Sequence, residues 1–418
     1  MPDRAACRRA IDRLQAKRAV AAGVEPEGPV VGGGLAAVRT AEQLRSSGCH
    51  GTITIVSAET HPPYDRPPLS KEILQDPARG PADVELKPAE FYRDNDIVLR
   101  LGSAAEELDT GAATVRLANG SVLGYGELVI ATGLVPRRIP SFPDLAGIHV
   151  LRTIDESLAL RAEATGARHA VIVGAGFIGC EVAASLRRLG VQVVLVEPQP
   201  TPLAAVLGQS VGELVARLHR DEGVDVRTGV GVAEVNGRDG HVTGVTLSDG
   251  TALDADLVVV GIGSRPATGW LSGSGVELEP DGGVRCDSTG RTSAPHVWAL
   301  GDVAAWCDDA GHCARVEHWS NVADQARVMV AAILGQQPPE LVVVPYFWSD
   351  QYDVKIQSLG EPRASDIAHI VSDDGRKFLA YYEREGRLVG VVGGGMPGKV
   401  MKARSKVASR VPIGEVLD

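Results

Sequence analysis

The sequence predicts an α/β protein in which a strand, a glycine turn, a helix and a second strand occur twice in this order, with an α+β region after them. The fuller copy starts at the apolar run 171–173, which ends in a glycine-rich turn, and another copy starts near residue 30. Beyond Pro338 and Pro339, apolar and polar residues alternate in a way that is typical of strands. We therefore expect two Rossmann-like units and a C-terminal α+β domain.

The turn of the later copy reads Gly174-x-Gly176-x-x-Gly179. Gly174 would make the tight turn, Gly176 would let backbone N–H groups approach a pyrophosphate, and Gly179 would let helix and strand pack closely. The next strand ends at Glu197, 23 residues after Gly174. Because strand, turn, helix, strand and acid occur in order, the pattern indicates a dinucleotide site rather than glycine packing alone.

The earlier copy has Gly32, Gly34 and Ala37 in place of the three glycines, and a small residue is permitted at the third position. Its second strand leads to Glu59, 27 residues after Gly32. Two copies predict two dinucleotides, and in the simplest arrangement one stays bound while the other exchanges.

The acids Glu59 and Glu197 each follow the second strand of a copy. A carboxylate there can accept hydrogen bonds from a ribose diol and would repel a 2′-phosphate. No basic residue occurs in 198–203, directly after Glu197. The later site is therefore expected to prefer NADH over NADPH.

The overall composition excludes several classes of protein. A chain of 418 residues has room for two or three domains, and its net charge of −11 argues against nucleic acid or an anionic membrane as a general partner. No apolar run approaches the length needed to cross a bilayer.

The six cysteines are scattered, with neither C-x-x-C pairs nor metal-ligand spacing. Cys307 and Cys313 flank a loop that contains His312, but no fourth ligand is near, so we expect no metal site. Reduced thiols and a cytoplasmic location fit this cysteine usage.

The N-terminal residues 1–28 form an atypical basic extension that lacks the apolar region of a secretory signal. Pro29 leaves only Val30 and Val31 for the strand before Gly32. Because proline has no ladder donor, we expect Pro29 at the first residue of the strand or on a sheet edge. Either the extension is tolerated or the first nucleotide site is impaired.

The proline-rich segment 61–71 follows Glu59 and carries Arg66 and Lys71. It is either a rigid surface loop or a clamp that holds two cations against a cofactor, and the sequence alone does not separate these alternatives.

Further strands set the expected domain boundaries. Hairpins are expected at 114–123 and 242–253, with Asn119-Gly120 and Asp249-Gly250 as turns. Two buried strands, which end in glycine turns at Gly133 and Gly263, are interpreted as crossings between the nucleotide domains. The expected divisions are a first nucleotide domain at 29–130 and 258–335, a second inserted at 131–257, and the C-terminal domain at 336–418.

The C-terminal domain is expected to contain an apolar strand at 341–348, further strands at 378–382 and 388–392, and an amphipathic helix at 399–411. The apolar face of this helix would contain Val400, Ala403, Val407 and Val411, and its basic face Lys399, Lys402, Lys406 and Arg410. On an acidic protein, a basic face is either merely solvated or a docking surface for an acidic partner.

The motifs together resemble the FAD-dependent ferredoxin reductases of the putidaredoxin reductase and aromatic-ring dioxygenase reductase family. The resemblance covers about residues 30 to 395. The sequences that carry it are Pro63-Tyr-Asp-Arg-Pro-Pro-Leu-Ser-Lys71, Ala131-Thr-Gly133, Gly174 to Glu181, Leu300-Gly-Asp302, Val316-Glu-His-Trp319 and Tyr346-Phe-Trp-Ser-Asp-Gln351. The region around Pro29 and the glycine-rich stretch 393–398 depart from the family.

The resemblance implies a glutathione-reductase-like fold with an FAD domain, an inserted NADH domain and a C-terminal domain. It also implies an ion pair of Lys71 and Glu181 beside flavin N5. The residues implied for FAD are Gly32, Gly34, Ala37, Glu59, Arg66, Lys71, Ala131, Thr132, Gly133, Asp302, Trp319 and Trp348. Those implied for NADH are Gly174, Gly176, Gly179, Glu197 and Gly263.

The resemblance further implies hydride transfer from NADH to FAD and single-electron transfer to an acidic [2Fe–2S] ferredoxin that feeds an oxygenase. The alternatives that stay open are an oxidoreductase for rubredoxin, a quinone or a small radical, and a slow-turnover regulatory flavoprotein.

Overall fold

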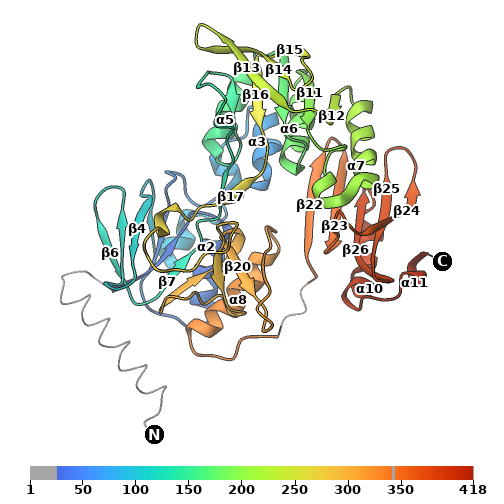
Figure 1. Cartoon of the computed structure of the whole chain (residues 1–418). Coiled ribbons are helices and arrows are strands. Elements are labelled where there is room, and N and C mark those ends of the chain that lie inside the picture. The colour runs from blue at the N-terminus through green and yellow to red at the C-terminus, as the bar shows by residue number, and fades with distance from the viewer. Residues whose placement is uncertain (1–25, 341–343, 418) are drawn as a thin grey trace. The chain divides into compact units, whose positions relative to one another are not determined.

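The computed structural model describes residues 26–340 and 344–417 (Figure 1). Most of the expected N-terminal extension, 1–28, lies outside these residues. The described chain forms two compact units. Unit 1 contains 26–65, 81–135 and 265–340, and unit 2 contains 66–80, 136–264 and 344–417. The short segment 66–80 thus belongs to the same unit as residues far along the chain.

The centre of unit 1 is a parallel sheet with the strand order β19-β7-β1-β2-β3. Strands β2 and β7 are short runs of mainly β-branched and aliphatic residues, as expected for buried parallel strands, whereas only the last two residues of β1 are of this kind. Their bounds are Pro26–Val31 for β1, Ile53–Val56 for β2, Ile97–Arg100 for β3, Leu128–Ile130 for β7 and Val297–Ala299 for β19.

Two helices of unit 1, α2 (Leu35–Ser46) and α8 (Asn321–Ile333), pack against each other although their sequences are far apart. Ala37 and Ala41 of α2 form one core cluster with Met329 of α8 and with residues of the sheet. Small residues on α2 allow this close packing, which fixes the start of α2 at the end of β1.

The expectation that Pro29 begins a strand or lies on an edge is wrong. Strand β1 begins at Pro26 and lies inside the sheet, where it pairs with β2 on one side. On its other side, β1 pairs with β6 at Pro26 and Glu27 and with β7 at Val30 and Val31. The missing N–H of Pro29 falls where this neighbour changes, so proline is tolerated inside the strand.

Strand β6 (Val122–Tyr125) forms the predicted hairpin with β5 (Thr114–Leu117), and Gly120 in its turn has a φ of +81°. Strand β4 (Ala105–Asp109) pairs with β5 on its other side. The remaining elements of unit 1 are η2 (Pro81–Val84), α4 (Ala89–Asp94), η3 (Gly269–Leu271), β18 (Val284–Cys286), η4 (Gly301–Val303), β20 (Ala304–Cys307) and β21 (Cys313–Arg315).

Unit 2 contains a second parallel sheet, with the strand order β12-β11-β10-β16-β9. The strands are β9 (Ile148–His149), β10 (His169–Val173), β11 (Gln192–Glu197), β12 (Asp225–Thr228) and β16 (Leu257–Val260). The helices that accompany them are α5 (Ile154–Ala164), α6 (Phe177–Arg188) and α7 (Ala204–Asp221). Helix α5 begins at a capping box of Thr153 and Glu156.

The second predicted hairpin is present in unit 2, where β14 (His241–Leu247) pairs with β15 (Ala252–Asp254). Strand β13 (Val232–Arg238) pairs with β14 on its other side. The short strands β8 (Leu134–Pro136) and β17 (Ser264–Pro266) lie where the chain passes from one unit to the other, close to Gly133 and Gly263.

The C-terminal part of unit 2 is an antiparallel sheet with the order β22-β23-β26-β25-β24. Its strands are β22 (Tyr346–Gln351), β23 (Val354–Gly360), β24 (Ile367–Asp373), β25 (Phe378–Arg384) and β26 (Arg387–Gly394). The strands expected at 378–382 and 388–392 are confirmed as parts of β25 and β26. The strand expected at 341–348 falls partly outside the described residues, and β22 begins only at Tyr346.

The single helix expected at 399–411 is wrong, because two short helices take its place, α9 (Pro397–Lys402) and α10 (Arg404–Ala408). At Ala403 the ψ angle is −7°, and its N–H donates to Val400 O three residues earlier instead of four. The expected apolar face is nevertheless buried at Val400, Ala403 and Val407. A short helix α11 (Gly414–Leu417) follows.

Within residues 26–340 and 344–417, no helix has both the length and the apolar character needed to cross a membrane.

Candidate functional site

The first glycine turn lies at the carboxyl edge of the parallel sheet in unit 1. Gly32 follows β1, the segment Ala131 to Gly133 follows β7, and Asp302 follows β19. Because these three strands are parallel neighbours, their carboxyl ends bring all of these residues to one edge of the sheet. Such an edge is where open α/β sheets bind ligands.

The backbone at this turn leaves room only for glycine. Gly32 has a φ of +143°, and a Cβ on it would lie 2.0 Å from Ala131 O. A Cβ on Gly33 would lie 2.2 Å from Ser57 Oγ. Gly34 is the N-cap of α2, so the unpaired N–H groups of the first helical turn begin here. The turn therefore has the close backbone approach that a pyrophosphate needs.

Other predicted residues of unit 1 lie around this edge. Glu59, which follows β2, is half-buried and accepts a hydrogen bond from the Tyr64 hydroxyl. Thr132 Oγ1 donates to Ala267 O at 2.9 Å. A Cβ on Gly301, next to Asp302, would lie 3.1 Å from Ala36 Cβ, so this chain segment closely approaches the first turn of α2.

The second glycine turn, in unit 2, repeats the first in its hydrogen bonding. Gly174 N donates to Val196 O at 2.8 Å, as Gly32 N donates to Val56 O at 2.8 Å. Gly174 has a φ of +98°, and a Cβ on it would lie 2.5 Å from Gly261 O. The N-cap of α6 is Gly176, and a Cβ on Gly179 would lie 2.1 Å from Gly174 O.

Glu197 ends β11 and connects that strand to the glycine turn. Its Oε2 accepts from Ala175 N at 2.7 Å, and its Oε1 accepts from Gln199 N at 2.9 Å. The carboxylate is thus fixed beside the turn by two backbone donors. Gly263, with a φ of +90°, follows β16 at the same edge and accepts from Arg137 N at 2.9 Å.

The predicted pair of Lys71 and Glu181 is present and buried within unit 2. Lys71 stands between η1 (Pro67–Ser70) and α3 (Glu72–Gln75), and Glu181 is on α6. Lys71 Nζ lies 2.7 Å from Glu181 Oε2 and donates to Pro67 O at 2.9 Å. Only 9% of Lys71 and 3% of Glu181 is exposed. A buried charge pair with such partners is costly to assemble and points to a function.

Sequence reasoning missed the other side chains that hold this carboxylate. Ser70 Oγ donates to Glu181 Oε2, and Ser349 Oγ donates to Glu181 Oε1 at 2.8 Å. Ser349 and Gln351 are two residues apart on β22 and both are fully buried. Two polar residues on one face of a strand that begins Tyr-Phe-Trp were a signal available in the sequence.

The remaining predicted flavin residues are distributed over both units. In unit 1, Trp319 Nε1 donates to Asp65 Oδ1 at 2.8 Å. In unit 2, Arg66 donates to Arg152 O at 2.7 Å and Trp348 stacks with Tyr346, at 6.1 Å between ring centroids.

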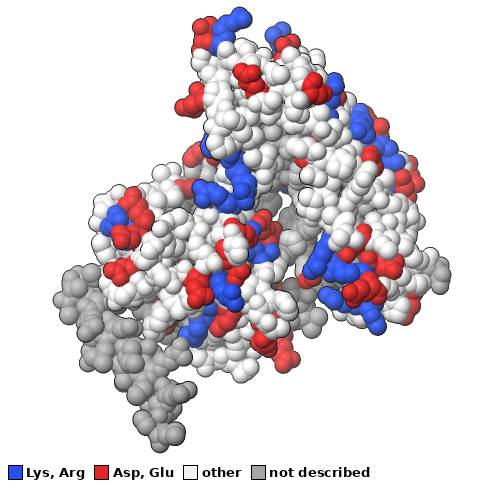
Figure 2. All heavy atoms as spheres, in the orientation of Figure 1, with Lys and Arg blue, Asp and Glu red and all other residues white. Residues whose placement is uncertain are grey.

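The four cations predicted for partner docking, Lys399, Lys402, Lys406 and Arg410, are all exposed. On the face drawn in Figure 2, acidic and basic side chains are interspersed.

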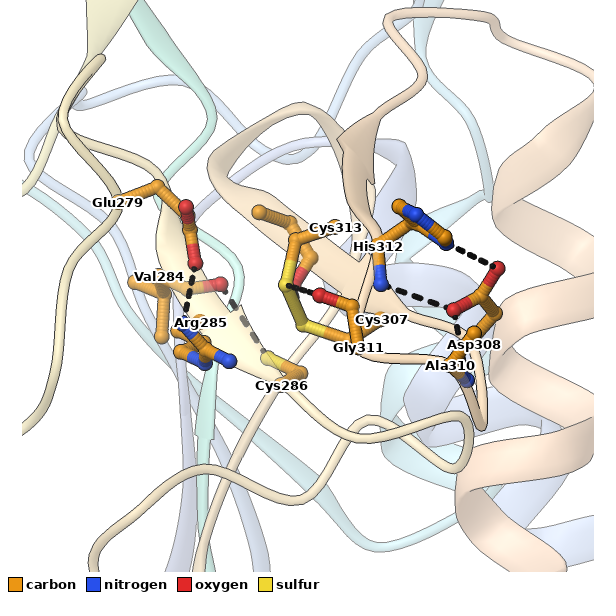
Figure 3. The surroundings of a disulfide bond; sticks show 11 residues. Glu279, Val284, Arg285, Cys286, Cys307, Asp308, Ala310, Gly311, His312 and Cys313 are labelled. Atoms are coloured by element: carbon orange, nitrogen blue, oxygen red, sulfur yellow. Dashed lines mark hydrogen bonds and ion pairs between the residues drawn. A yellow bond between two sulfur atoms is a disulfide. The ribbon is translucent and has the colours of Figure 1, made fainter.

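The expectation of reduced thiols is wrong for one pair, since Cys307 and Cys313 form a disulfide (Figure 3). The two residues face each other on the antiparallel strands β20 and β21, which brings their Cα atoms to 3.9 Å. Among the described residues, Glu279 with these two cysteines is the group close enough to hold a metal ion, but the sulfur atoms are bonded to each other. Burial raises the pKa of the Cys180 and Cys286 thiols, which disfavours their reactive thiolate forms.

Comparison with known proteins agrees with this geometry. Residues 29–328 match the family described as pyridine nucleotide-disulphide oxidoreductase, and residues 346–416 match the reductase C-terminal family. A ferredoxin–NAD(P)(+) reductase of a Sphingomonas species is 40% identical over 86% of this chain and 87% of its own length. The chain belongs to the ferredoxin reductase family. FAD and NAD(H) are its cofactors, and it is an oxidoreductase.

Two further relatives extend this comparison. The ferredoxin–NAD(+) reductase component of the p-cumate 2,3-dioxygenase system of Pseudomonas putida is 36% identical over 82% of this chain and 83% of its own length. The covalent complex of putidaredoxin reductase with putidaredoxin has a TM-score of 0.88 at 30% identity, covering 94% of this chain and 96% of that one. The expected fold class and family are therefore confirmed.

Proposed function

We propose that this ferredoxin reductase takes electrons from NADH through FAD and delivers them to a [2Fe–2S] ferredoxin that feeds an oxygenase. The observation that carries the proposal is the pair of glycine turns, each with the backbone conformation of a dinucleotide cradle, together with the buried Lys71–Glu181 pair. When bound, FAD supplies the ability to take up a hydride and give up electrons singly.

The turn in unit 1 would hold the FAD pyrophosphate, since its N–H groups and the start of α2 favour an anion. Gly32, Gly34 and Ala37 would line that contact, and Glu59 would accept from the adenosine ribose. The other residues proposed for FAD are Arg66, Lys71, Ala131, Thr132, Gly133, Asp302, Trp319 and Trp348.

The turn in unit 2 would hold NADH in the same way, through Gly174, Gly176 and Gly179, with Gly263 beside them. Glu197 would accept from the ribose hydroxyls and would repel a 2′-phosphate. Its fixation by Ala175 N and Gln199 N supports this role, because the carboxylate cannot turn away to admit a phosphate without losing both bonds.

The catalytic role proposed for Lys71 and Glu181 is electrostatic. Lys71 would present a fixed ammonium to the flavin and favour its reduced, more negative form. Glu181 would hold that ammonium in position, since the salt bridge is buried and leaves Lys71 little freedom.

The domain division at 29–130 and 258–335 for FAD, 131–257 for NADH and 336–418 for the C-terminal domain remains our proposal. The partner would be an acidic ferredoxin that docks near Lys399, Lys402, Lys406 and Arg410, whose exposure supports this role. We also place the protein in the cytoplasm, where NADH is supplied.

The proposal is tested by NADH-dependent turnover with a set of [2Fe–2S] ferredoxins, a rubredoxin and a soluble quinone. We expect at least one [2Fe–2S] ferredoxin to be reduced faster than either of the other acceptors. Faster reduction of rubredoxin or quinone than of every ferredoxin would contradict the assignment of the acceptor, while NADH oxidation itself would still support the nucleotide sites.

A further inference from the structure

A chain of buried hydrogen bonds extends from Glu181 away from Lys71, through side chains that the proposed function does not use. Ser349 Oγ donates to Glu181 Oε1 at 2.8 Å, and Gln351 Nε2 donates to Ser349 Oγ at 3.2 Å. Gln351 Oε1 lies 3.1 Å from His219 Nε2, and His219 Nδ1 lies 2.8 Å from the Tyr352 hydroxyl oxygen. Ser349, Gln351 and His219 are each 0% exposed.

The donor and the acceptor in every hydrogen bond of this series follow from the carboxylate of Glu181 at its end. A carboxylate only accepts, so the single hydroxyl proton of Ser349 points to Glu181 and Ser349 Oγ must accept from Gln351. The amide of Gln351 then presents its oxygen to His219, which requires a proton on His219 Nε2. His219 Nδ1 is left as an acceptor for the Tyr352 hydroxyl.

His219 is unusual among these residues, because it is a buried ionisable side chain whose two hydrogen-bond partners, Gln351 and Tyr352, are uncharged. Burial lowers the pKa of His219 to about 4, although its hydrogen bond to Gln351 acts in the opposite direction. Its titratable neighbour on β22 and the following turn is Tyr352, whose pKa burial raises. The hydrogen-bonded side chains from Tyr352 to Ser349 are therefore neutral near neutral pH, and Glu181 is the charged group at the end of the series.

The chain also joins three elements of unit 2 that are distant in sequence. His219 is on α7, Ser349 and Gln351 are on β22, and Glu181 is on α6. A shift of β22 would move Ser349, which donates to Glu181, and a shift of α7 would move His219, which holds the amide of Gln351. The conformation of Glu181 is thus tied to the packing of α7 and β22.

We propose that Ser349, Gln351 and His219 are positioning residues that hold Glu181, and through it Lys71, in the arrangement used for flavin reduction. They do so through a series of hydrogen bonds that all donate in the direction of Glu181. The inference rests on the catalytic role proposed above for Lys71 and Glu181. These three residues act through Glu181 and contact the reaction only in this indirect way.

The first test reads the polarity of the chain without any measurement of activity. ¹⁵N NMR of histidine-labelled protein, with the His219 signal assigned by its loss in His219→Gln, should show a neutral ring protonated on Nε2 from pH 5.5 to 8. A ring protonated on Nδ1, or a titration near pH 6.5, would overturn the assignment of donors and acceptors in these hydrogen bonds.

The second test measures the rate of flavin reduction by saturating NADH in a stopped-flow instrument, together with the dissociation constant of NADH. Gln351→Glu replaces the amide donor by an acceptor of the same shape, so Ser349 loses the donor that orients it. His219→Leu removes the donor to Gln351. We expect either change to slow flavin reduction between about tenfold and a hundredfold, with NADH affinity unchanged.

His219→Gln keeps an N–H donor and should restore the rate to within about threefold of the wild type, which a loss of packing alone would not predict. Gln357→Glu is the matched control, since Gln357 is a buried amide of the neighbouring strand β23 that donates to Tyr346. It should lower stability and leave the reduction rate unchanged.

Lys71→Met and Glu181→Gln separate failure of this inference from failure of the proposed function. If neither variant slows flavin reduction, the role proposed for the pair is wrong. If both slow it while Gln351→Glu and His219→Leu do not, the pair is catalytic and the positioning chain alone is overturned.

Discussion

At the scale of single residues, the proposed nucleotide binding depends most on Glu197, Gly32 and Gly174. In our proposal, Glu197 would decide between two nicotinamide cofactors that differ by one phosphate, since its carboxylate is held beside the glycine turn by Ala175 N and Gln199 N. The effect is electrostatic and local, so it can be tested by one substitution.

Replacing Glu197 with arginine should weaken NADH and strengthen NADPH, changing the ratio of their kcat/KM values by about tenfold or more, or about 1.4 kcal/mol. The reason is that a cation replaces an anion where the 2′-phosphate would lie. Glu197→Gln is the control, since it removes the charge but keeps an acceptor for Ala175 N. If Glu197→Arg left the cofactor preference unchanged, the proposed contact of Glu197 with the ribose would be wrong.

His219 makes the stability of the protein depend on pH. Its folded-state pKa, about 4, lies below the ordinary histidine value of 6.5, so the unfolded chain takes up a proton first as the pH falls. The His219 contribution to stability is therefore present above pH 6.5 and is lost between pH 6.5 and 4, by about 3 kcal/mol. Urea unfolding of wild type and His219→Gln from pH 8 to 4.5 should give free energies that converge as the pH falls. Curves that stay parallel would show that His219 is not the group responsible.

At the scale of elements, the sequence was most informative where backbone geometry leaves one choice of residue. Gly32 and Gly174 could be recognised because both turns need a backbone conformation and a free volume that only glycine offers. The hairpin turns at Gly120 and Gly250 were recognised from backbone conformation alone, since both have a positive φ but nothing lies within 4 Å of a Cβ there. The position of Pro29 was predicted wrongly. A proline is tolerated inside β1 because the neighbouring strand changes there from β6 to β7, and this change depends on tertiary structure.

The same limit applies to other elements. Lys71 and Glu181 were identified through family motifs, but His219 on α7 was not, because its partners on β22 are more than a hundred residues away. The disulfide of Cys307 and Cys313 was missed because it depends on the pairing of β20 with β21. The break at Ala403 has no proline or glycine to signal it.

The two turns can be separated by matched substitutions. Gly32→Ala should abolish FAD binding, because the Cβ would collide with Ala131 O, whereas Gly174→Ala should retain FAD and lose NADH, because its Cβ would collide with Gly261 O. Flavin absorbance and NADH titration measure the two effects. Gly120→Ala, with a positive φ but nothing within 4 Å of its Cβ, controls for backbone strain of about 1–2 kcal/mol. Loss of FAD in Gly174→Ala would contradict the assignment of the turns.

The helices α9 and α10 allow a test of partner docking. Lys402→Glu combined with Lys406→Glu should slow ferredoxin reduction about tenfold at low salt and leave ferricyanide reduction unchanged, because steering by charge is specific to the protein partner. Arg168→Glu combined with Arg238→Glu is the control, since both cations are exposed and lie outside the C-terminal sheet and its helices. Equal slowing of ferredoxin reduction by the two double variants would mean that only the net charge of the protein matters, and would contradict docking near Lys402 and Lys406.

At the scale of the whole molecule, each unit contains one glycine turn that we propose as a nucleotide site, and the C-terminal sheet contributes Ser349, which donates to Glu181. The fold class and the family were predictable because each cradle repeats the same strand, turn and helix. The grouping of segment 66–80 with unit 2 was not, because it depends on the contacts of Lys71 with residues on α6.

An anaerobic visible spectrum of the purified protein would show whether FAD and NADH are bound together and react as in an NADH-dependent flavoprotein reductase. We expect a flavin spectrum that bleaches rapidly with one equivalent of NADH and returns when an oxidised [2Fe–2S] ferredoxin is added. Absence of flavin absorbance even after FAD is supplied, or a flavin that stays oxidised in the presence of NADH, would contradict it.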